Sequence, residues 1–407
     1  MILREVYADH AGTTPPAAEV VRAMEPYLGE RFGNASSVHR RGEEARAAIE
    51  EARARVADLI GAASEEIVFT ASGSEANNLA LKGALEAAPP DRRRLVVSAI
   101  EHPSVLETAR HLEARGYRLT VVPVDSRGVV EPRRVAETVG PDVALVSVML
   151  INNEIGAIQP VREIAALAHA AGARMHTDAV QAVGKLAVVV GDLGVDLLSL
   201  AGHKFHGPPG AAALYARRRT RLVPLIHGGH QERSRRAGTE NLAAIVGLGV
   251  AAERVVRGLA ATSARVAPLG ERLLGGLLER VPGARLNGDQ ACCLPSIVNL
   301  CFPGVDGEAV LHELDLEGIT VSTGSACSAA SPGPSHVLLA LGLRPEDAHA
   351  SVRFSLGEGN DEGDVERILE KTPAIVARLR SLATASPART NSANSANAAD
   401  RTFSGTA

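Results

Sequence analysis

The chain has 407 residues, of which 45% are hydrophobic and 22% are charged, and its formal net charge is −4. This length exceeds one simple core, so two domains of an ordinary soluble globular protein are expected. The small negative charge gives no electrostatic reason to expect nucleic acid or an anionic membrane as a partner. No segment has the layout of a signal peptide or the length of a membrane span, so a cytoplasmic location is expected.

Short β-branched runs alternate with helical patterns in the first half of the chain. The spacing of apolar residues predicts helices near 40–60, 75–87, 104–115, 131–139 and 161–171. Strands are predicted at Ile67–Thr70, Leu95–Ser98, Leu119–Val122, Val143–Val148, Arg174–Thr177 and Leu197–Leu200. This alternation predicts an α/β fold with a mainly parallel sheet covered by helices on both faces. Ligands bind at the carboxyl ends of the strands in such sheets, so the loops after these strands are the candidate site.

The first two of these loops carry small and polar residues. Thr70–Asn78 (TASGSEANN) follows a strand and opens a helix, where Gly73 and Ser74 suit an anion such as phosphate. A capped turn with Ser72 or Ser74 as the N-cap is the alternative reading of the same residues. The second loop ends in His102, directly before a proline, and an isolated histidine there is equally compatible with a structural role.

The next loops add an amide, a carboxylate and a lysine. Asn152–Gly156 (NNEIG) is either a polar turn or a ligand contact, and Asp178 is either a helix cap or the partner of a ring nitrogen. Lys204 lies between a buried strand and the break Gly207–Gly210 (GPPG), where partial desolvation would favour a nucleophile or a Schiff-base former. An ordinary surface lysine is the alternative. The set as a whole supplies what pyridoxal phosphate needs: an anion site, ring contacts, a pyridinium partner and an amine.

At this point the sequence resembles the class V aminotransferase-like pyridoxal-phosphate enzymes, and within them the cysteine desulfurases, from about Val6 to about Leu379. The motifs that carry the resemblance are Tyr7–Pro15 (YADHAGTTP), Gly33–His39 (GNASSVH), Glu101–Pro103, NNEIG at 152–156, His176–Gln181 (HTDAVQ), Gly202–Gly210 (GHKFHGPPG) and Gly228–Asn241. Val321–Ser328 (VSTGSACS) is similar to the cysteine loop of the desulfurases. It continues to Pro332–Leu338, as in the longer loop of the first desulfurase group, the NifS and IscS type.

The resemblance implies a fold-type I pyridoxal-phosphate transferase with a smaller α+β domain. It implies that Lys204 holds the cofactor as a Schiff base, that Asp178 pairs with the pyridine nitrogen, and that His102 stacks on the ring and moves protons. Further cofactor contacts implied in the same way are Gly73, Ser74, Asn153, Gln181 and His203. Thr239 would reach the phosphate of the neighbouring subunit, which implies a homodimer.

The substrate side of the site is also implied by the resemblance. Arg353, in Ser351–Gly357 (SVRFSLG), would clamp the α-carboxylate of L-cysteine, with Asn34 as a second substrate contact. Cys327 would receive the substrate sulfur as a persulfide and release L-alanine. A sulfur-acceptor protein for iron–sulfur cluster assembly or for tRNA or cofactor thiolation would follow. No firm metal site is expected, apart from Cys327 as a transient iron–sulfur ligand.

Several positions depart from the family pattern. Ala201 stands where the family often has a phosphate-binding serine, and whether Ser199 replaces it is open. His10 and Gly12 replace commoner Asn and Ala, and Ser74 stands for a usual threonine, which keeps the hydroxyl. The other cysteines, Cys292, Cys293 and Cys301, lie among apolar residues and are expected to be buried thiols.

The predicted domains are a large cofactor-binding domain at residues 13–255 and a small domain formed by residues 1–12 and 256–385. Residues 386–407 are rich in Ala, Ser and Asn and are expected to be disordered. Three rival functions are a selenocysteine lyase, another class V transaminase or lyase, and an inactive scaffold for iron–sulfur assembly partners. An intact set of Lys204, Asp178, Cys327 and Arg353 argues against the last.

Overall fold

The computed structural model describes residues 5–323 and 333–385, and within them the larger body is built on a seven-stranded sheet of order β2-β8-β7-β6-β5-β3-β4. Its strands are β2 (Ile67–Thr70), β3 (Arg94–Ser98), β4 (Arg118–Val122), β5 (Val143–Ser147), β6 (Arg174–Asp178), β7 (Leu197–Ala201) and β8 (Ala212–Ala216). The pairs from β4 through β3, β5 and β6 to β7 are parallel, whereas β8 is antiparallel to β2 and β7. The predicted α/β class with a mainly parallel sheet is therefore confirmed.

Helices follow the strands as the periodicity predicted. They are α1 (Ala18–Leu28), α2 (Arg40–Leu59), α3 (Gly73–Glu86), α4 (Pro103–Ala114), α5 (Pro132–Thr138), α6 (Val161–Ala170), α7 (Val190–Leu193) and the long α8 (Leu242–Arg280). The strand β8 was not predicted from the sequence, because its residues AALYA lack the β-branched side chains that mark strands. It forms a strand because its backbone pairs with β2 on one side and with β7 on the other.

Each central strand is buried on both faces, and successive residues enter different cores. In β2, Val68 joins a cluster with α3 and α4, whereas Ile67 and Phe69 join a cluster with α2, α6 and α8. In β3, Val96 likewise faces away from Leu95 and Val97, as the two-residue period of a strand requires. The sheet thus lies between two helical layers, and its carboxyl edge stays open for a site.

A smaller body is built from both ends of the described chain. Here β10 (Ile297–Cys301) pairs antiparallel with β9 (Arg285–Leu286) and β12 (Ser351–Ser355), while β1 (Val6–Tyr7) pairs parallel with β11 (Ile319–Thr320). Helices α9 (Gly307–Leu316) and α12 (Glu362–Ala385) pack in this body, whereas α10 (His336–Ala340) and α11 (Pro345–His349) bury residues in the core of the larger one. Its apolar core is a separate cluster centred on residues such as Leu273, Phe302 and Phe354.

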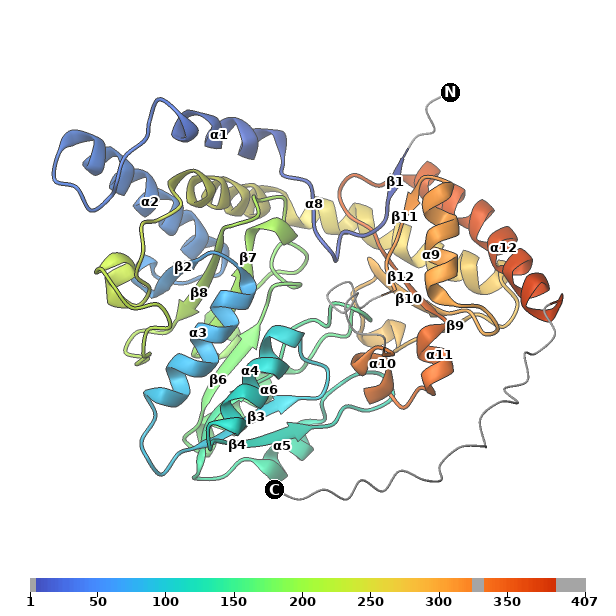
Figure 1. Cartoon of the computed structure of the whole chain (residues 1–407), viewed down its shortest axis with the longest axis horizontal. Coiled ribbons are helices and arrows are strands. Elements are labelled where there is room, and N and C mark those ends of the chain that lie inside the picture. Colours follow the sequence, from blue (N-terminus) through green and yellow to red (C-terminus); the bar gives the residue numbers. More distant parts are fainter. Residues whose placement is uncertain (1–4, 324–332, 386–407) are drawn as a thin grey trace, which may run out of the picture.

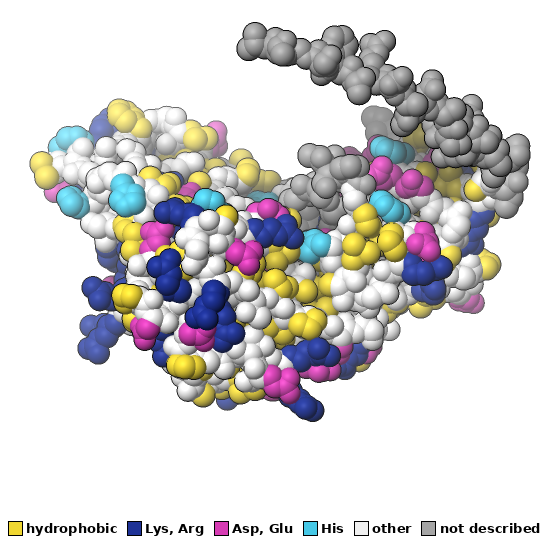
Figure 2. All heavy atoms as spheres, turned by 60° about the horizontal axis from the view of Figure 1, so that its bottom comes forward, with side chains coloured by type: hydrophobic (Ala, Val, Ile, Leu, Met, Phe, Trp, Pro, Cys, Tyr) yellow, Lys and Arg dark blue, Asp and Glu magenta, His cyan; other side chains and the backbone are white. Residues whose placement is uncertain are grey.

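Figure 1 shows α8 running from the larger body into the smaller one. The predicted domain boundary at 255/256 falls inside this helix, and the boundaries themselves remain a prediction. Cys327 and the predicted tail at 386–407 lie outside the described residues. Across the described residues, every helix is too short or too polar to cross a bilayer. Figure 2 shows acidic and basic side chains interspersed over one face of the molecule.

Candidate active site

A cavity of about 320 Å³ opens at the carboxyl edge of the sheet, where the predicted site residues meet. Its volume is within the range of small-molecule sites. Its lining includes Gly73, Ser74, His102, Asn153, Asp178, Gln181, His203, Lys204 and Arg353. Two other predicted site residues, Asn34 and Thr239, are exposed and do not line this cavity. A single chain therefore brings most of the predicted residues together.

Lys204 ends a 3₁₀ turn, Gly202–Lys204, that follows β7 directly. Its ammonium nitrogen Nζ donates to the main-chain oxygens of Ala11 at 2.7 Å and Gly12 at 2.5 Å. Both acceptors belong to the segment that enters from β1 in the smaller body. The partly buried, held lysine that the sequence predicted is therefore present, and the N-terminal segment is what holds it.

Asp178 stands at the end of β6 with both carboxylate oxygens engaged. Its Oδ1 accepts from the Val180 amide at 2.9 Å, and its Oδ2 accepts from Asn77 Nδ2 at 2.7 Å. The same Asn77 nitrogen donates to Ser104 Oγ at 2.8 Å, and that hydroxyl lies 2.8 Å from His102 Nδ1. A hydrogen-bonded chain therefore connects Asp178 to His102 through two side chains from α3 and α4.

The His102 ring has a defined tautomer. His102 caps α4, and its Nδ1 accepts from the Ser104 main-chain amide at 3.1 Å. Burial lowers the pKa of His102, and the charges of Lys204 and His336 lower it further, although Asp178 acts in the opposite direction. A neutral ring whose Nδ1 is an acceptor carries its proton on Nε2.

The start of α3 forms a cradle for an anion. Ser72 is the N-cap and accepts from the Glu75 amide at 3.1 Å, so the next main-chain N–H groups face the cavity beside Ser74. A Cβ atom at Gly73 would lie 2.9 Å from Val180 Cγ2, so the backbone comes this close only because residue 73 is glycine. The capped turn predicted for this loop is confirmed, with Ser72 as the N-cap, and binding of a phosphate at the same turn stays a prediction.

The position of Ser199 shows whether its hydroxyl could replace the phosphate-binding serine that the family often has where Ala201 stands. Ala201 lines the cavity, whereas Ser199 is fully buried in β7 and its hydroxyl lies 3.1 Å from His176 Nε2. Ser199 therefore does not replace a serine at residue 201. His203 borders the cavity, with Nδ1 3.0 Å from Thr13 Oγ1, and burial with the charges of Lys204 and Lys185 lowers its pKa to about 4.

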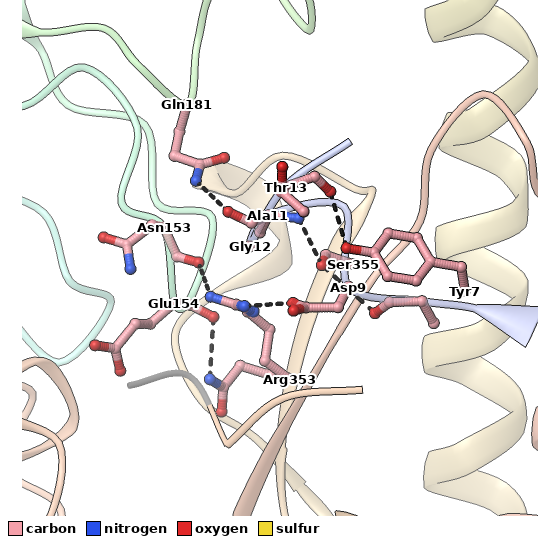
Figure 3. Close-up of polar contacts among 12 residues, drawn as sticks. Tyr7, Asp9, Ala11, Gly12, Thr13, Asn153, Glu154, Gln181, Arg353 and Ser355 are labelled. Atoms are coloured by element: carbon pink, nitrogen blue, oxygen red, sulfur yellow. Dashed lines mark hydrogen bonds and ion pairs between the residues drawn. The ribbon is translucent and has the colours of Figure 1, made fainter. Parts of the chain in front are cut away.

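Arg353 lies in β12, at the boundary between the two bodies. Its Nη1 donates to the main-chain oxygen of Asn153 at 2.8 Å, and its Nη2 pairs with Asp9 Oδ1 at 2.6 Å (Figure 3). Its side chain is only 2% exposed, yet it lines the cavity. The guanidinium is therefore fixed against the cavity from both bodies of the molecule.

Two departures from the family pattern have a packing explanation. A Cβ at Gly12 would lie 2.3 Å from Asp9 Oδ2, so glycine leaves room for the carboxylate that reaches Arg353. A Cβ at residue 357 would lie 2.3 Å from His10 Nδ1, so His10 fits only against Gly357. Burial, followed by the charges of His206 and Lys185, lowers the pKa of His10 to about 4.

Two buried glutamates under the cavity were not predicted from the sequence. Glu101 Oε1 accepts from Ser98 Oγ at 2.5 Å and from the Met149 amide at 2.8 Å, and burial raises the pKa of Glu101 to about 8. Glu154 accepts from Ser335 Oγ at 2.5 Å, and burial raises its pKa as well. Both residues lie inside motifs that the sequence singled out for a neighbouring residue.

Sequence reasoning also missed Asn77, Ser104 and Asp9. Each lies in or beside a motif named in the sequence analysis. Asn77 belongs to the loop Thr70–Asn78, Ser104 directly follows Glu101–Pro103, and Asp9 belongs to Tyr7–Pro15. What the pattern does not give is the direction of each side chain. That direction depends on packing between elements far apart in the chain.

Asn34 and Thr239 are exposed and are absent from the lining of this cavity. Thr239 follows a 3₁₀ turn, Gln231–Ser234, in which Glu232 and two following residues have positive φ values of 46°, 56° and 61°. Glu232 is buried and pairs with Arg53, at 2.7 and 2.8 Å, which holds this strained turn against β2.

Three of the four cysteines are described, and none of them lines the cavity. Cys301 is buried as predicted, whereas Cys292 and Cys293 are only half-buried. Burial raises the pKa of all three thiols, to about 12 for Cys293. These thiols are therefore poor sources of thiolate near neutral pH.

The comparisons with known proteins agree with this site. The family model for aminotransferase class-V matches residues 6–368. The cysteine desulfurase IscS of Dictyoglomus turgidum is 45% identical over 93% of this chain and 96% of its own length. The cysteine desulfurase NifS of Azotobacter vinelandii is 43% identical over 93% of this chain and 94% of its own length.

Solved structures show the same likeness in three dimensions. A NifS-like protein superposes with a TM-score of 0.87 at 36% identity, covering 92% of this chain and all of that chain. A structure described as SspA in complex with cysteine superposes with a TM-score of 0.77 at 36% identity, covering 87% and 99%. The chain belongs to the aminotransferase class-V family, within which its relatives are the cysteine desulfurases of the IscS and NifS type.

Proposed function

We propose that this protein is a pyridoxal-phosphate-dependent cysteine desulfurase that converts L-cysteine to L-alanine and transfers the sulfur to Cys327. One observation carries the proposal: Lys204, Asp178 and Arg353 line a single cavity, although they come from the turn after β7, from β6 and from β12. An amine, a carboxylate and a guanidinium in one small cavity match what an amino-acid substrate and a pyridine cofactor require. The relatives named cysteine desulfurase support the choice of substrate.

The residues present fit pyridoxal phosphate. The N-terminus of α3 with Gly73 and Ser74 suits its phosphate, and Asp178 suits its ring nitrogen, since that carboxylate faces the cavity with neutral donors behind it. Lys204 would hold it covalently, and His102 would stack on its ring. When bound, pyridoxal phosphate supplies an electron sink for carbanion formation at the substrate Cα. Gln181, Asn153 and His203 would complete the contacts.

Arg353 is proposed to bind the α-carboxylate of L-cysteine. Its guanidinium is already fixed by Asp9 and by the Asn153 carbonyl, so little side-chain entropy is lost when a carboxylate binds. Burial strengthens the charge-assisted contact relative to one in water. Arg353 would therefore fix the orientation of the substrate by holding its α-carboxylate.

Proton transfer is assigned to Lys204 and His102. Lys204 Nζ, once released from the cofactor, is the proposed base for the substrate Cα proton. His102 is neutral because burial lowers its pKa, and its proton lies on Nε2. The neutral ring can therefore donate a hydrogen bond from Nε2, and it can pass on a proton only after it has taken one up.

Cys327 is the proposed sulfur acceptor within the chain, and it lies outside the described residues. The three described thiols have raised pKa values and lie away from the cavity, which leaves the loop cysteine for this role. The reaction transfers one sulfur atom from the substrate to the enzyme. L-cysteine loses sulfur and becomes L-alanine, its Cβ gaining a hydrogen, while the Cys327 thiol becomes a persulfide.

We propose a homodimer to account for Thr239, a predicted cofactor contact that does not line the cavity of its own chain. Thr239 is exposed and does not line the chain's own cavity, as expected of a residue that serves a neighbouring site. Asn34, the second proposed substrate contact, is exposed and does not line it either. The strained turn before Thr239, held by the Glu232–Arg53 pair, would fix this reach. An acceptor protein for iron–sulfur assembly or thiolation, and a cytoplasmic location, belong to the same proposal.

The test compares wild type with Cys327→Ser and the matched control Cys293→Ser. Each protein is loaded with pyridoxal phosphate, and its visible absorbance, L-alanine formation and sulfide release from L-cysteine are measured. We expect all three to show cofactor absorbance, and only Cys327→Ser to lose alanine and sulfide formation. Sustained sulfide release by Cys327→Ser would remove Cys327 from the reaction. Formation of pyruvate or a keto acid in place of alanine would indicate a transaminase or another lyase.

A further inference from the structure

Lys185 is a second lysine beside Lys204, and nothing in the proposed reaction uses it. It follows the motif at 176–181 and lines a separate cavity of about 490 Å³ that also borders Lys204. Its main-chain oxygen accepts from Ser263 Oγ of α8 at 3.2 Å, which fixes the backbone at this point. Lys185 thus lines the neighbouring cavity, and it contacts the proposed cofactor site through Gln181.

Within residues 5–323 and 333–385, the Lys185 ammonium hydrogen-bonds to the side chain and backbone of Gln181 alone. Its Nζ donates to Gln181 Oε1 at 3.1 Å and to the Gln181 main-chain oxygen at 3.2 Å. Both acceptors are uncharged amide oxygens, so the Lys185 charge is held without a carboxylate in either contact. A buried charge in such surroundings is costly unless the contacts serve another purpose.

These contacts fix the orientation of the Gln181 amide. An ammonium can only donate, so Gln181 Oε1 must face Lys185, and Nε2 must then point the other way. That Nε2 donates to the Ala11 main-chain oxygen at 2.7 Å (Figure 3). The same oxygen accepts from Lys204 Nζ at 2.7 Å, so Gln181 and Lys204 share one acceptor. Lys185, Gln181, Ala11 and Lys204 thus form one continuous hydrogen-bonded chain.

We propose that Lys185 is a positioning residue, which holds the Gln181 side chain with its N–H groups toward the cofactor cavity and places a positive charge behind Lys204. The proposal rests on the proposed cofactor site. It gives Gln181 a donor, rather than an acceptor, to present to the ring oxygen of the cofactor. The charge behind Lys204 disfavours a proton on the lysine nitrogen and on the imine it would form.

The electrostatic surroundings of Lys185 agree with this role. Burial, followed by the charges of Lys204 and Arg353, lowers the pKa of Lys185 to about 7. The other titratable or charged groups that line the 490 Å³ cavity are His10, His206, Arg254, Arg257, Glu19 and Glu358. Arg254 pairs with both Glu358 and Glu19, so the acidic groups of the cavity already have a partner.

The test uses the cofactor-loaded protein with Lys185→Met, which keeps an unbranched side chain but removes donors and charge. Lys185→Arg keeps both, and Lys82→Met, on half-buried α3 surface, is the matched control. The readouts are the pH at which the bound cofactor's absorbance changes, the dissociation constant of pyridoxal phosphate, and kcat and KM for L-cysteine.

We expect Lys185→Met to shift the absorbance transition upward by at least about 0.5 pH unit, because a nearby positive charge is lost. The cofactor should bind several-fold more weakly, and kcat should fall more than KM changes, since Arg353 is untouched. Lys185→Arg should restore most of each property. If Lys185→Met matched Lys82→Met in absorbance and cofactor affinity, the positioning role would be wrong.

A second measurement covers a variant that fails to fold. Competitive acetylation of the wild type across pH, read by mass spectrometry of the Lys185 peptide, reports the titration of this lysine directly. A half-reaction at or above about pH 7 leaves Lys185 charged at neutral pH, as the proposal requires, whereas a half-reaction well below pH 7 overturns it. A wild type that holds no pyridoxal phosphate would instead refute the proposed function, which separates the two failures.

Discussion

Asp9 and Arg353 are 344 positions apart in the chain and form an ion pair of 2.6 Å at the edge of the cofactor cavity. The Arg353 side chain is almost fully buried, whereas Asp9 is 18% exposed. The pair joins the N-terminal segment, which holds Lys204, to the strand that carries the proposed substrate clamp. The positions of Lys204 and Arg353, the two cations of the proposed site, therefore depend on the same short segment.

Replacing Asp9 by Asn should change both the free energy of unfolding and the KM for L-cysteine. Asn keeps an oxygen acceptor for Arg353 Nη2 but removes the negative charge. The free energy of unfolding should fall by about 1.5–3 kcal/mol, the usual value of a hydrogen bond to a charged group. KM for L-cysteine should rise, because a neutral partner holds the Arg353 guanidinium less firmly before the substrate carboxylate binds. Denaturant unfolding and steady-state kinetics measure both, with the exposed pair partner Glu137→Gln as control. A fall in KM would contradict this account.

The buried pair of Arg53 and Glu232 should contribute more to stability than any exposed pair. Glu232→Gln leaves the buried Arg53 guanidinium with only the half-exposed Glu50 as a charge partner, and breaking a buried pair typically costs about 3–5 kcal/mol. Glu137→Gln, in a pair exposed on both sides, should cost less than about 0.5 kcal/mol. Equal unfolding midpoints for these two variants in urea would show that the pair does not hold the turn at Gln231–Ser234.

Asn77 should matter for cofactor binding through Asp178. Asn77→Asp replaces the amide that donates to Asp178 Oδ2 at 2.7 Å with a second carboxylate, so two like charges meet. The pyridoxal phosphate dissociation constant should rise more than tenfold near pH 8, and fall back as the shared pair takes up a proton at lower pH. Asn77→Ala lacks the charge, so its affinity should be lowered without this pH dependence. Indistinguishable pH profiles would exclude the charge effect.

Glu101 should make the protein less stable as the pH rises. Its folded pKa of about 8 lies above the ordinary value of 4.5, so the folded state binds the extra proton. This stabilisation is fully present below about pH 4.5 and is lost as the pH rises toward 8, on the order of 1 kcal/mol per pH unit.

The measurement is the free energy of unfolding at several pH values between 5 and 8. In Glu101→Gln the side chain cannot ionise, so the difference between wild type and variant should shrink or reverse as the pH rises. Glu113→Gln, at an exposed position of α4, is the control and should track wild type. A wild-type difference that stays constant with pH would show that Glu101 is ionised in the folded protein.

The alternation of β-branched and helical segments determined the α/β class, and the predicted strands up to β7 form as expected. The order of motifs placed His102, Asn153, Asp178 and Lys204 at strand ends, where parallel strands bring them to one edge. Periodicity and loop chemistry are local properties of the chain, so the sequence by itself could determine them. The family followed from the motifs alone.

Only the tertiary structure decided which groups hold these residues. The main-chain oxygens of Ala11 and Gly12 at Lys204, and the Asp9 contact with Arg353, join segments that no local pattern connects. Strand β8 was missed because its place in the sheet, rather than its composition, makes it a strand. The physical reason is the same in each case. Side-chain direction and burial depend on which distant elements pack together, and these set the hydrogen bonds and the pKa shifts of the site.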